Sequence, residues 1–115
     1  KERKQFGRLI GEFQGLQHRA AHLYGEMEVA RATVMKAQQL LDEGSDAAEL
    51  YVSVAKATAG RAANLAVREG VQMHGGIGMT DEFDIGLYMK RDRALGEYMG
   101  DVNYHADRVA RLNGY

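Results

Sequence analysis

The sequence has 115 residues, of which 45% are hydrophobic, and its formal net charge is -1. This length and apolar share suffice for one domain with a hydrophobic core, and the balanced charge argues against a nucleic-acid partner, because such proteins carry a basic excess. Cysteine is absent, which excludes disulfides and thiolate metal sites, and no apolar run approaches the roughly 20 residues of a membrane span.

The composition predicts an all-α protein. Proline is absent, so the strongest helix breaker interrupts no segment, and residues with high helix propensity are frequent. The first residues, KERKQFG, are charged and have neither a starting Met nor the apolar core of a signal peptide. We therefore expect a cytoplasmic protein and a chain cut out of a longer one.

The first predicted helix covers residues 12–43, and Gly44 supplies its C-terminal stop. Its apolar positions alternate steps of three and four over about four heptads, which is the pattern of a helix that packs along one seam of a bundle. The seam consists of Phe13, Leu16, Ala20, Leu23, Met27, Ala30, Val34, Ala37 and Leu41.

The second predicted helix runs from Asp46 to near Met73. Asp46 and Glu49 have the spacing of a capping box, and Ser45 is the competing N-cap. Its centre is rich in small residues, so we expect another helix to approach it closely. The inner stripe consists of Tyr51, Ala55, Thr58, Ala62 and Leu65, and the close approach is expected at Ala57, Gly60 and Ala63.

Two shorter helices are predicted at the end of the chain. The first covers residues 82–98 with Thr80 or Asp81 as its cap, and the second begins at Asp101 and stops at Asn113 and Gly114. Two long helices and two short ones predict an up-and-down helical bundle. Because two long helices alone leave an exposed face, we expect the first bundle helix to be largely absent from this chain.

Two polar stretches stand out from the helical pattern. Residues 72–78 read QMHGGIG, and glycines after a helix let the backbone come close to an anion. Near the start, RKQFG at residues 3–7 offers a guanidinium, which pairs with a diphosphate bidentately. Taken alone, the first stretch is typical of a helix C-cap and the second of a solvated helix end.

Taken together, these stretches resemble the C-terminal domain of acyl-CoA dehydrogenases. The resemblance covers essentially residues 1–115, through ERKQFGRLIGEFQ, EVAR, AKA, VQMHGGIGMTDEF and MKRDRALGEYMG in the family's order and spacing. It implies a four-helix bundle that follows a helical domain and a β domain. It also implies an FAD-dependent flavoprotein, an oxidoreductase of fatty acid metabolism that oxidises the Cα–Cβ bond of an acyl-CoA thioester and passes electrons to an acceptor.

The resemblance also implies a cofactor site and an assembly. The residues carried over as FAD-binding are Arg3, Gln5, Phe6, Gln14, Gln72, Gly75 and Gly76. In the family these blocks typically bind the FAD diphosphate of a neighbouring subunit, and members are mostly dimers of dimers. We therefore expect a tetramer, either a homo-oligomer or a heteromer with a related subunit. His74 lies inside the second block, where it packs against the turn or hydrogen-bonds to it.

The catalytic base of the family is missing from its usual position. Many members carry a glutamate in a Tyr-Glu-Gly-Thr stretch, whereas EYMGD at residues 97–101 places Met99 there, and a thioether cannot accept a proton at neutral pH. The catalytic residue is therefore unknown. Three alternatives remain. The base comes from a helix upstream of this chain, or this chain is a non-catalytic subunit whose partner supplies the base, or Glu97 substitutes. For Glu97 the geometry is unfavourable, because two residues along a helix rotate a side chain by about 200°.

Other interpretations of the sequence remain open. A stand-alone helical interaction module without a cofactor is the rival from a different class. His18, His22 and Glu26 lie four residues apart and have the spacing of metal ligands, but an ordinary polar helix face explains them, so no metal is expected. KRDR at residues 90–93 has the charge to meet CoA or FAD phosphates, or it is simply solvated.

Overall fold

A computed structural model describes residues 2–80 and 83–115. The chain begins with a small antiparallel hairpin, β1 (Lys4–Gln5) and β2 (Arg8–Leu9), and a 3-10 turn (Ile10–Glu12). Two long helices follow, α1 (Gln14–Asp42) and α2 (Ala48–His74), then a 3-10 helix (Gly75–Met79), α3 (Ile85–Glu97) and α4 (Val102–Leu112). The predicted all-α bundle is confirmed, although the hairpin was not predicted.

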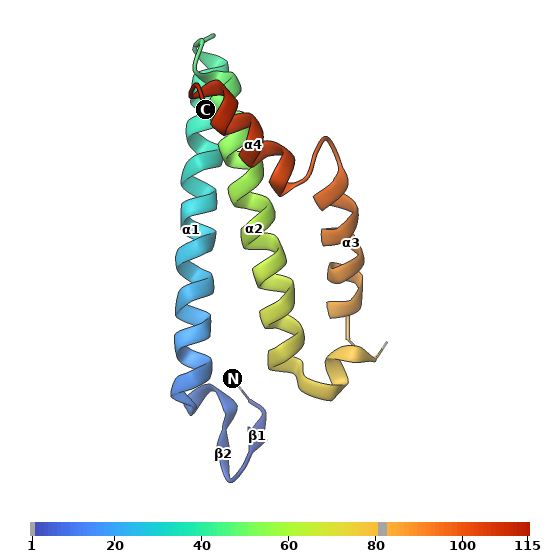
Figure 1. Ribbon diagram of the computed structural model, residues 1–115. Coiled ribbons are helices and arrows are strands. Elements are labelled where there is room, and N and C mark those ends of the chain that lie inside the picture. The colour runs from blue at the N-terminus through green and yellow to red at the C-terminus, as the bar shows by residue number, and fades with distance from the viewer. Residues whose placement is uncertain (1, 81–82) are drawn as a thin grey trace.

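The helices form an elongated bundle that measures 56 by 27 by 26 Å. α1 and α2 run antiparallel along its length, α4 crosses them at one end, and α3 stands beside α2 (Figure 1). The hairpin and the C-terminal end of α2 lie together at the other end, although many residues separate them in the chain (Figure 1).

The core lies mainly between α1 and α2 and is made of small residues. The hydroxyl oxygens of Thr33 and Thr58, one on each helix, lie 2.7 Å apart. A core made mostly of small side chains lets the two helix backbones approach closely. The buried residues of the two long helices are Ala30, Ala37 and Leu40 on α1, and Ala48, Ser53, Ala55, Ala57 and Ala62 on α2.

The predicted seam of α1 is only partly buried. Ala30 and Ala37 are buried as expected, but Leu40 is buried in place of Leu41, and Met27 and Val34 remain 47% and 38% exposed. Met27 and Val34 line a hollow of about 400 Å³ that Ala59, Ala63 and Ala66 of α2 complete. One edge of the seam therefore packs on α2, and the other lines this hollow.

Close approaches to α2 occur at two glycines. A methyl group built on Gly60 would lie 2.7 Å from Val102 Cγ2 of α4, and one on Gly70 would lie 2.7 Å from Ile85 Cδ1 of α3. The expected close approach of another helix at Gly60 is therefore confirmed. The Lys56 ammonium adds a hydrogen bond of 2.8 Å to the Leu95 carbonyl, which ties α3 to α2.

The predicted start of α4 is confirmed, whereas the predicted starts of α2 and α3 are wrong; α2 ends at His74, close to the predicted Met73. The Asp101 carboxylate accepts the Tyr104 N–H at 2.7 Å, and α4 ends before Asn113 and Gly114. α2 begins at Ala48, and no side chain caps its N-terminus. Ser45 Oγ accepts the Ala47 N–H within the turn that precedes the helix. The predicted capping box of Asp46 and Glu49 therefore does not form.

α3 begins only at Ile85, and its N-cap residue, Asp84, makes no side-chain cap bond. The Thr80 hydroxyl instead donates to the Ile77 carbonyl at 2.7 Å, within the preceding turn. Because the N-cap position of α3 falls on Asp84, the predicted cap at Thr80 is wrong, and Asp81 lies outside the described residues.

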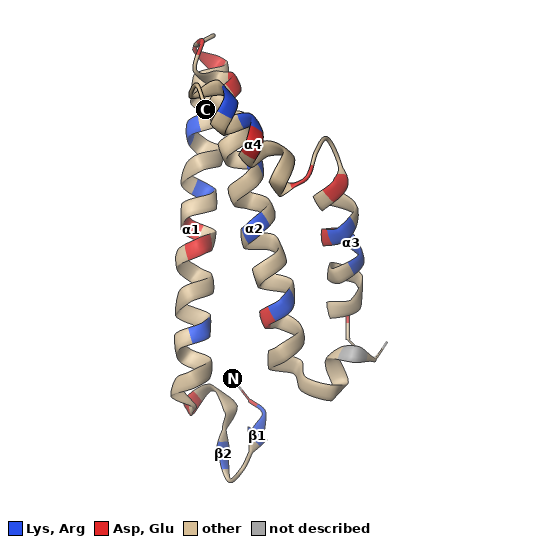
Figure 2. Cartoon of the chain, in the orientation of Figure 1, with Lys and Arg blue, Asp and Glu red and all other residues tan. Residues whose placement is uncertain are grey.

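Charged side chains of both signs are interspersed along the helices (Figure 2). Within the described part of the chain, two ion pairs join other helices to α2: Arg19 of α1 binds Glu69, and Arg108 of α4 binds Glu49. The hydrogen bond that the Arg108 guanidinium donates to the Glu49 carboxylate is the main cause that raises the pKa of Arg108 above its ordinary value. Among residues 2–80 and 83–115, no helix is both long and apolar enough to cross a membrane.

Candidate functional site

The hairpin places the first polar block at the end of the bundle. Lys4 pairs with Leu9 and Gln5 with Arg8, and the two turn residues, Phe6 and Gly7, have φ of 54° and 80°. Two successive positive φ angles are typical of the tight turns that match the twist of a hairpin. Phe6 is 85% exposed, so the turn holds a bulky apolar side chain in solvent at a backbone conformation that costs energy.

The second polar block forms the end of α2. The helix stops at His74, and Gly75 adopts φ of 65°, a conformation that L residues with a side chain rarely take. The Gly75 N–H donates to the carbonyls of Gln72 and Val71, so it closes the helix and does not face outward. A methyl group built on Gly76 would meet no atom within 4 Å, so the space beside this glycine is open.

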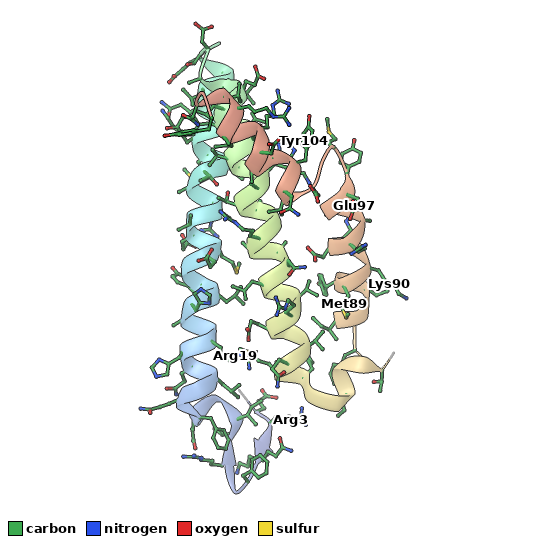
Figure 3. All side chains as sticks on the ribbon, viewed as in Figure 1. Arg3, Arg19, Met89, Lys90, Glu97 and Tyr104 are labelled. Atoms are coloured by element: carbon green, nitrogen blue, oxygen red, sulfur yellow. The ribbon has the colours of Figure 1, made fainter. Side chains whose placement is uncertain are left out.

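The fold brings the two blocks together. Arg3 Nη1 donates to the His74 carbonyl at 2.8 Å and lies 4.0 Å from the position of a methyl group on Gly75. Figure 3 shows Arg3 at the end of the bundle where the hairpin meets the turn after α2. A guanidinium carries five N–H donors, so this bond leaves donors for an anion at the glycine turn.

His74 connects the parts of this turn. Its ring Nδ1 donates to the Gly70 carbonyl at 2.7 Å, because a carbonyl oxygen can only accept. The ring lies 5.5 Å from the ring of Phe83, centroid to centroid, just before α3. His74 therefore packs against the turn, as expected, but its ring hydrogen-bonds to the last turn of α2 and not to the glycine turn itself.

A hollow of about 510 Å³ lies beside the two blocks. Its walls are almost entirely carbon, so it suits an apolar group, while Arg3 contributes a positive charge. Gln17 of α1 also contacts it and donates to the Gly11 carbonyl at 2.8 Å, which fixes α1 against the turn after the hairpin. The lining residues are Arg3, Ile10, Gly11, Leu16, Gln17, Ala20, Met73, His74, Ile77 and Phe83.

The other predicted site residues lie on the surface. Gln5 belongs to β1, Gln72 to the last turns of α2, and Gln14 is the first residue of α1, and all three side chains are exposed. The hydrogen bond that brings the two blocks together joins Arg3 to the His74 carbonyl and not to the Gln72 side chain. The assignment of these side chains to a cofactor therefore stays a prediction.

A second turn with unusual backbone lies between α3 and α4. Met99, which the resemblance predicts at the position of the family glutamate, has φ of 59° and is 75% exposed. Its carbonyl accepts a hydrogen bond of 3.0 Å from Nε2 of His105, which is 6% exposed and whose Nδ1 is buried without a partner. Among the described residues, Met99 and Phe6 are the two that have positive φ without being glycine.

The remaining candidate groups have ordinary surroundings. Glu97 is the last residue of α3, exposed, and 3.9 Å from Arg93. His22 Nε2 lies 3.7 Å from Glu26 Oε1 on the surface of α1. Within residues 2–80 and 83–115, no three His, Asp or Glu side chains gather as a metal site would require.

Two contacts that support the site were not predicted. Arg19 donates to both carboxylate oxygens of Glu69 at 2.6 and 3.1 Å, and thereby ties α1 to the last turns of α2. His105 supports the other turn from within the core. No local sequence signal marks either contact, because the partners of the first lie 50 residues apart and a lone histidine carries no pattern.

Comparison with known proteins gives a consistent result. The sequence model of one family, described as "Acyl-CoA dehydrogenase, C-terminal domain", matches residues 1–112. The short/branched chain specific acyl-CoA dehydrogenase of Bos taurus, a mitochondrial protein, is 37% identical over 112 residues, which is 96% of this chain and 26% of the relative. The chain thus spans about a quarter of the length of this relative.

Solved structures share the fold over nearly the whole chain. A structure described as an FAD complex of PigA is 25% identical with a TM-score of 0.91, and covers 99% of this chain and 30% of that one. The ChsE4–ChsE5 complex from Mycobacterium tuberculosis is 27% identical with a TM-score of 0.90, and covers 99% and 31%. With the family model matched over residues 1–112, this chain belongs to the acyl-CoA dehydrogenase family, a family of oxidoreductases.

Proposed function

We propose that this chain is the C-terminal domain of an FAD-dependent acyl-CoA dehydrogenase and that it binds the flavin diphosphate at the turn after α2. The observation that carries the proposal is the hydrogen bond between Arg3 and the His74 carbonyl, which joins the two polar blocks. A diphosphate is a dianion that favours a guanidinium, amide donors and close backbone. The residues at this end of the bundle supply all three.

The donor set fits the cofactor, with one adjustment. Arg3 supplies the charge, Gln72 an exposed amide, and Gly76 an open approach to the backbone. Gly75 contributes by its shape, because its N–H is engaged in closing α2. Gln5, Phe6 and Gln14 complete the proposed set on the hairpin side. The adjacent apolar hollow holds room for an uncharged part of the same ligand.

The chemistry of the site divides between this chain and the rest of the enzyme. When bound, FAD supplies the acceptor for the hydride that leaves Cβ of the acyl-CoA. Met99 cannot take the proton from Cα, because a thioether is not a base at neutral pH. Glu97 is a poor replacement, because it lies exposed beside Arg93. We therefore place the base in a segment upstream of residue 1 or in a partner subunit.

A second candidate function follows from the methionine. A non-catalytic subunit would bind flavin and shape a site whose base comes from a related partner. The similarity to one structure described as the ChsE4–ChsE5 complex supports a heteromer, and exposed apolar side chains on α3, such as Leu87, Tyr88 and Leu95, support assembly in general. We expect a tetramer in which this domain contributes to the interface between subunits.

The flavin proposal is tested on the protein in its native full length. Arg3→Ala is purified next to Arg8→Ala, a matched control on the same hairpin whose guanidinium lies 4.2 Å over the Phe13 ring. We expect Arg3→Ala to weaken FAD binding about tenfold to a hundredfold, because a charge-assisted hydrogen bond contributes about 1.5–3 kcal/mol. Bound flavin is measured by absorbance after gel filtration. Equal retention in both variants would contradict the contact, and a colourless native protein would favour the cofactor-free interaction module.

A turnover assay distinguishes the catalytic enzyme from the non-catalytic subunit. The protein alone is offered acyl-CoA substrates of short, long and steroid-side-chain type with an artificial electron acceptor. Turnover by the protein alone would exclude the partner-dependent version and point to a base upstream of residue 1. Turnover that requires a related subunit, together with a heteromer in mass photometry, would support the non-catalytic subunit.

A further inference from the structure

We infer that His74 is a positioning residue that holds Arg3 at the glycine turn before any ligand binds. The inference rests on the proposed function, since it concerns the same flavin site. One residue makes both connections that matter: its carbonyl accepts from Arg3, and its ring donates to the Gly70 carbonyl. It thereby links the N-terminal hairpin to the last turns of α2.

The carbonyl of His74 is available because of its place at a helix end. The last four carbonyls of an α-helix have no partner within the helix. Those of Val71 and Gln72 accept from the Gly75 N–H, and that of His74, the N-cap residue of the following 3-10 helix, also accepts from Arg3. The Arg3 bond therefore ties the hairpin to the junction between α2 and the 3-10 helix, and it would be lost if this carbonyl turned away.

The side chain of His74 keeps that carbonyl in place. Its ring is fixed to the helix by the bond to Gly70 and contacts Phe83 on the other side. The chain also folds back over it, because a methyl group built on Gly78 would lie 2.8 Å from His74 Cβ. A ring that is held on several sides leaves the peptide after it little freedom to rotate.

The consequence for binding is preorganisation. A flexible arginine that must be ordered on binding lowers the affinity for its ligand, whereas one held in advance does not. His74→Ala should therefore weaken FAD binding about threefold to tenfold, and it should do so only while Arg3 is present.

The test is a double-mutant cycle on the native full-length protein, with the dissociation constant of FAD as the readout. We expect His74→Ala to weaken binding in the wild-type background and to change it less than twofold in the Arg3→Ala background, because the two residues act through one contact. Equal factors in both backgrounds, or no effect of His74→Ala, would overturn the inference. His18→Ala, an exposed histidine on α1, is the matched control.

Rescue separates positioning from simple stability. His74→Asn should restore most of the affinity, since Asn113 in this chain already shows that an asparagine amide at a helix end donates to the carbonyl four residues earlier, at 2.8 Å. If His74→Ala lowers the melting temperature of the flavin-free protein, His74→Phe replaces it in the cycle, because a phenyl ring keeps the packing on Phe83 and lacks the donor. Failure of Asn to rescue would count against the inference.

The outcomes distinguish this inference from the proposal beneath it. If the native protein takes up no FAD, or if Arg3→Ala binds it as tightly as wild type, the proposed function itself fails. If Arg3→Ala weakens binding and the cycle is additive, the flavin site stands and only the positioning role of His74 is refuted.

Discussion

Two turns of this molecule are built from similar residues, but one is open beside its glycine and the other is closed. At the turn after α2, Gly75 has positive φ and a histidine, His74, donates from its ring to the backbone carbonyl of Gly70. At the turn between α3 and α4, Gly100 has positive φ and a second histidine, His105, donates to the Met99 carbonyl. The first turn is open beside Gly76, and the second is filled by its own side chains.

The difference lies in what surrounds the glycines. A methyl group on Gly100 would lie 2.5 Å from Tyr104 Cδ1 and 3.1 Å from His105 Nε2, whereas one on Gly76 would meet nothing within 4 Å. The turn between α3 and α4 is therefore a closed structural joint that displays residue 99 outward. The turn after α2 leaves space at its backbone, which is the property a ligand site requires.

The largest effect is expected at the closed turn. Gly100→Ala should lower the free energy of unfolding by about 2–4 kcal/mol, because the backbone conformation is unfavourable for alanine and the methyl group collides with the Tyr104 ring. Urea denaturation followed by circular dichroism measures the change. A loss under about 0.5 kcal/mol would mean that the two turns are not different in packing.

His105 is expected to matter next. His105→Ala removes the buried donor to the Met99 carbonyl and should cost about 2 kcal/mol of unfolding free energy. His105→Gln keeps an N–H donor of similar reach and should cost less than half of that. The same denaturation experiment compares the two variants, and equal losses would refute the hydrogen bond as the stabilising contact.

The N-cap of α4 should contribute less. Asp101→Ala removes the acceptor for the Tyr104 N–H and should cost about 1 kcal/mol. Asp46→Ala is the matched control, because Asp46 caps no helix here and its loss should be nearly neutral. Thermal unfolding of both variants compares the two losses of stability. A larger loss for Asp46→Ala than for Asp101→Ala would show that Asp46 caps α2 after all.

The smallest effect on stability is expected at the open turn. Gly76→Ala should leave the free energy of unfolding within about 0.5 kcal/mol of wild type, since the methyl group meets no atom. The same variant should weaken FAD binding, because that methyl group occupies the space proposed for the diphosphate. Fluorescence titration of the native full-length protein with FAD measures this. Unchanged binding would place the ligand elsewhere.

The elements were predictable where the signal is local. The apolar steps of α1, the absence of proline and the Asp101 cap depend on residues within a few positions of one another, and the structure follows them. One error arose where neighbours distant in the chain decide: Leu40 is buried in place of Leu41 because the seam of α1 faces both α2 and the hollow beside it. The hairpin was missed although its partners are close in the chain, because its two-residue strands are too short to show a pattern.

The candidate site divides in the same way. The two polar blocks, and with them the family, could be recognised from QMHGGIG and RKQFG at their spacing. The bond of Arg3 to the His74 carbonyl could not, because 71 residues separate the partners and a backbone carbonyl leaves no mark in a sequence. The engagement of the Gly75 N–H also emerged only from the geometry at the end of α2.

The sequence alone determined the helical class, the approximate ends of the long helices and the two blocks of site residues, because propensity, periodicity and glycine placement act over short distances. Only the tertiary structure decided which turn is open and which is closed, and which donors remain for a ligand. Those properties depend on side chains and carbonyls that meet across the bundle, such as Tyr104 against Gly100 and Arg3 against His74.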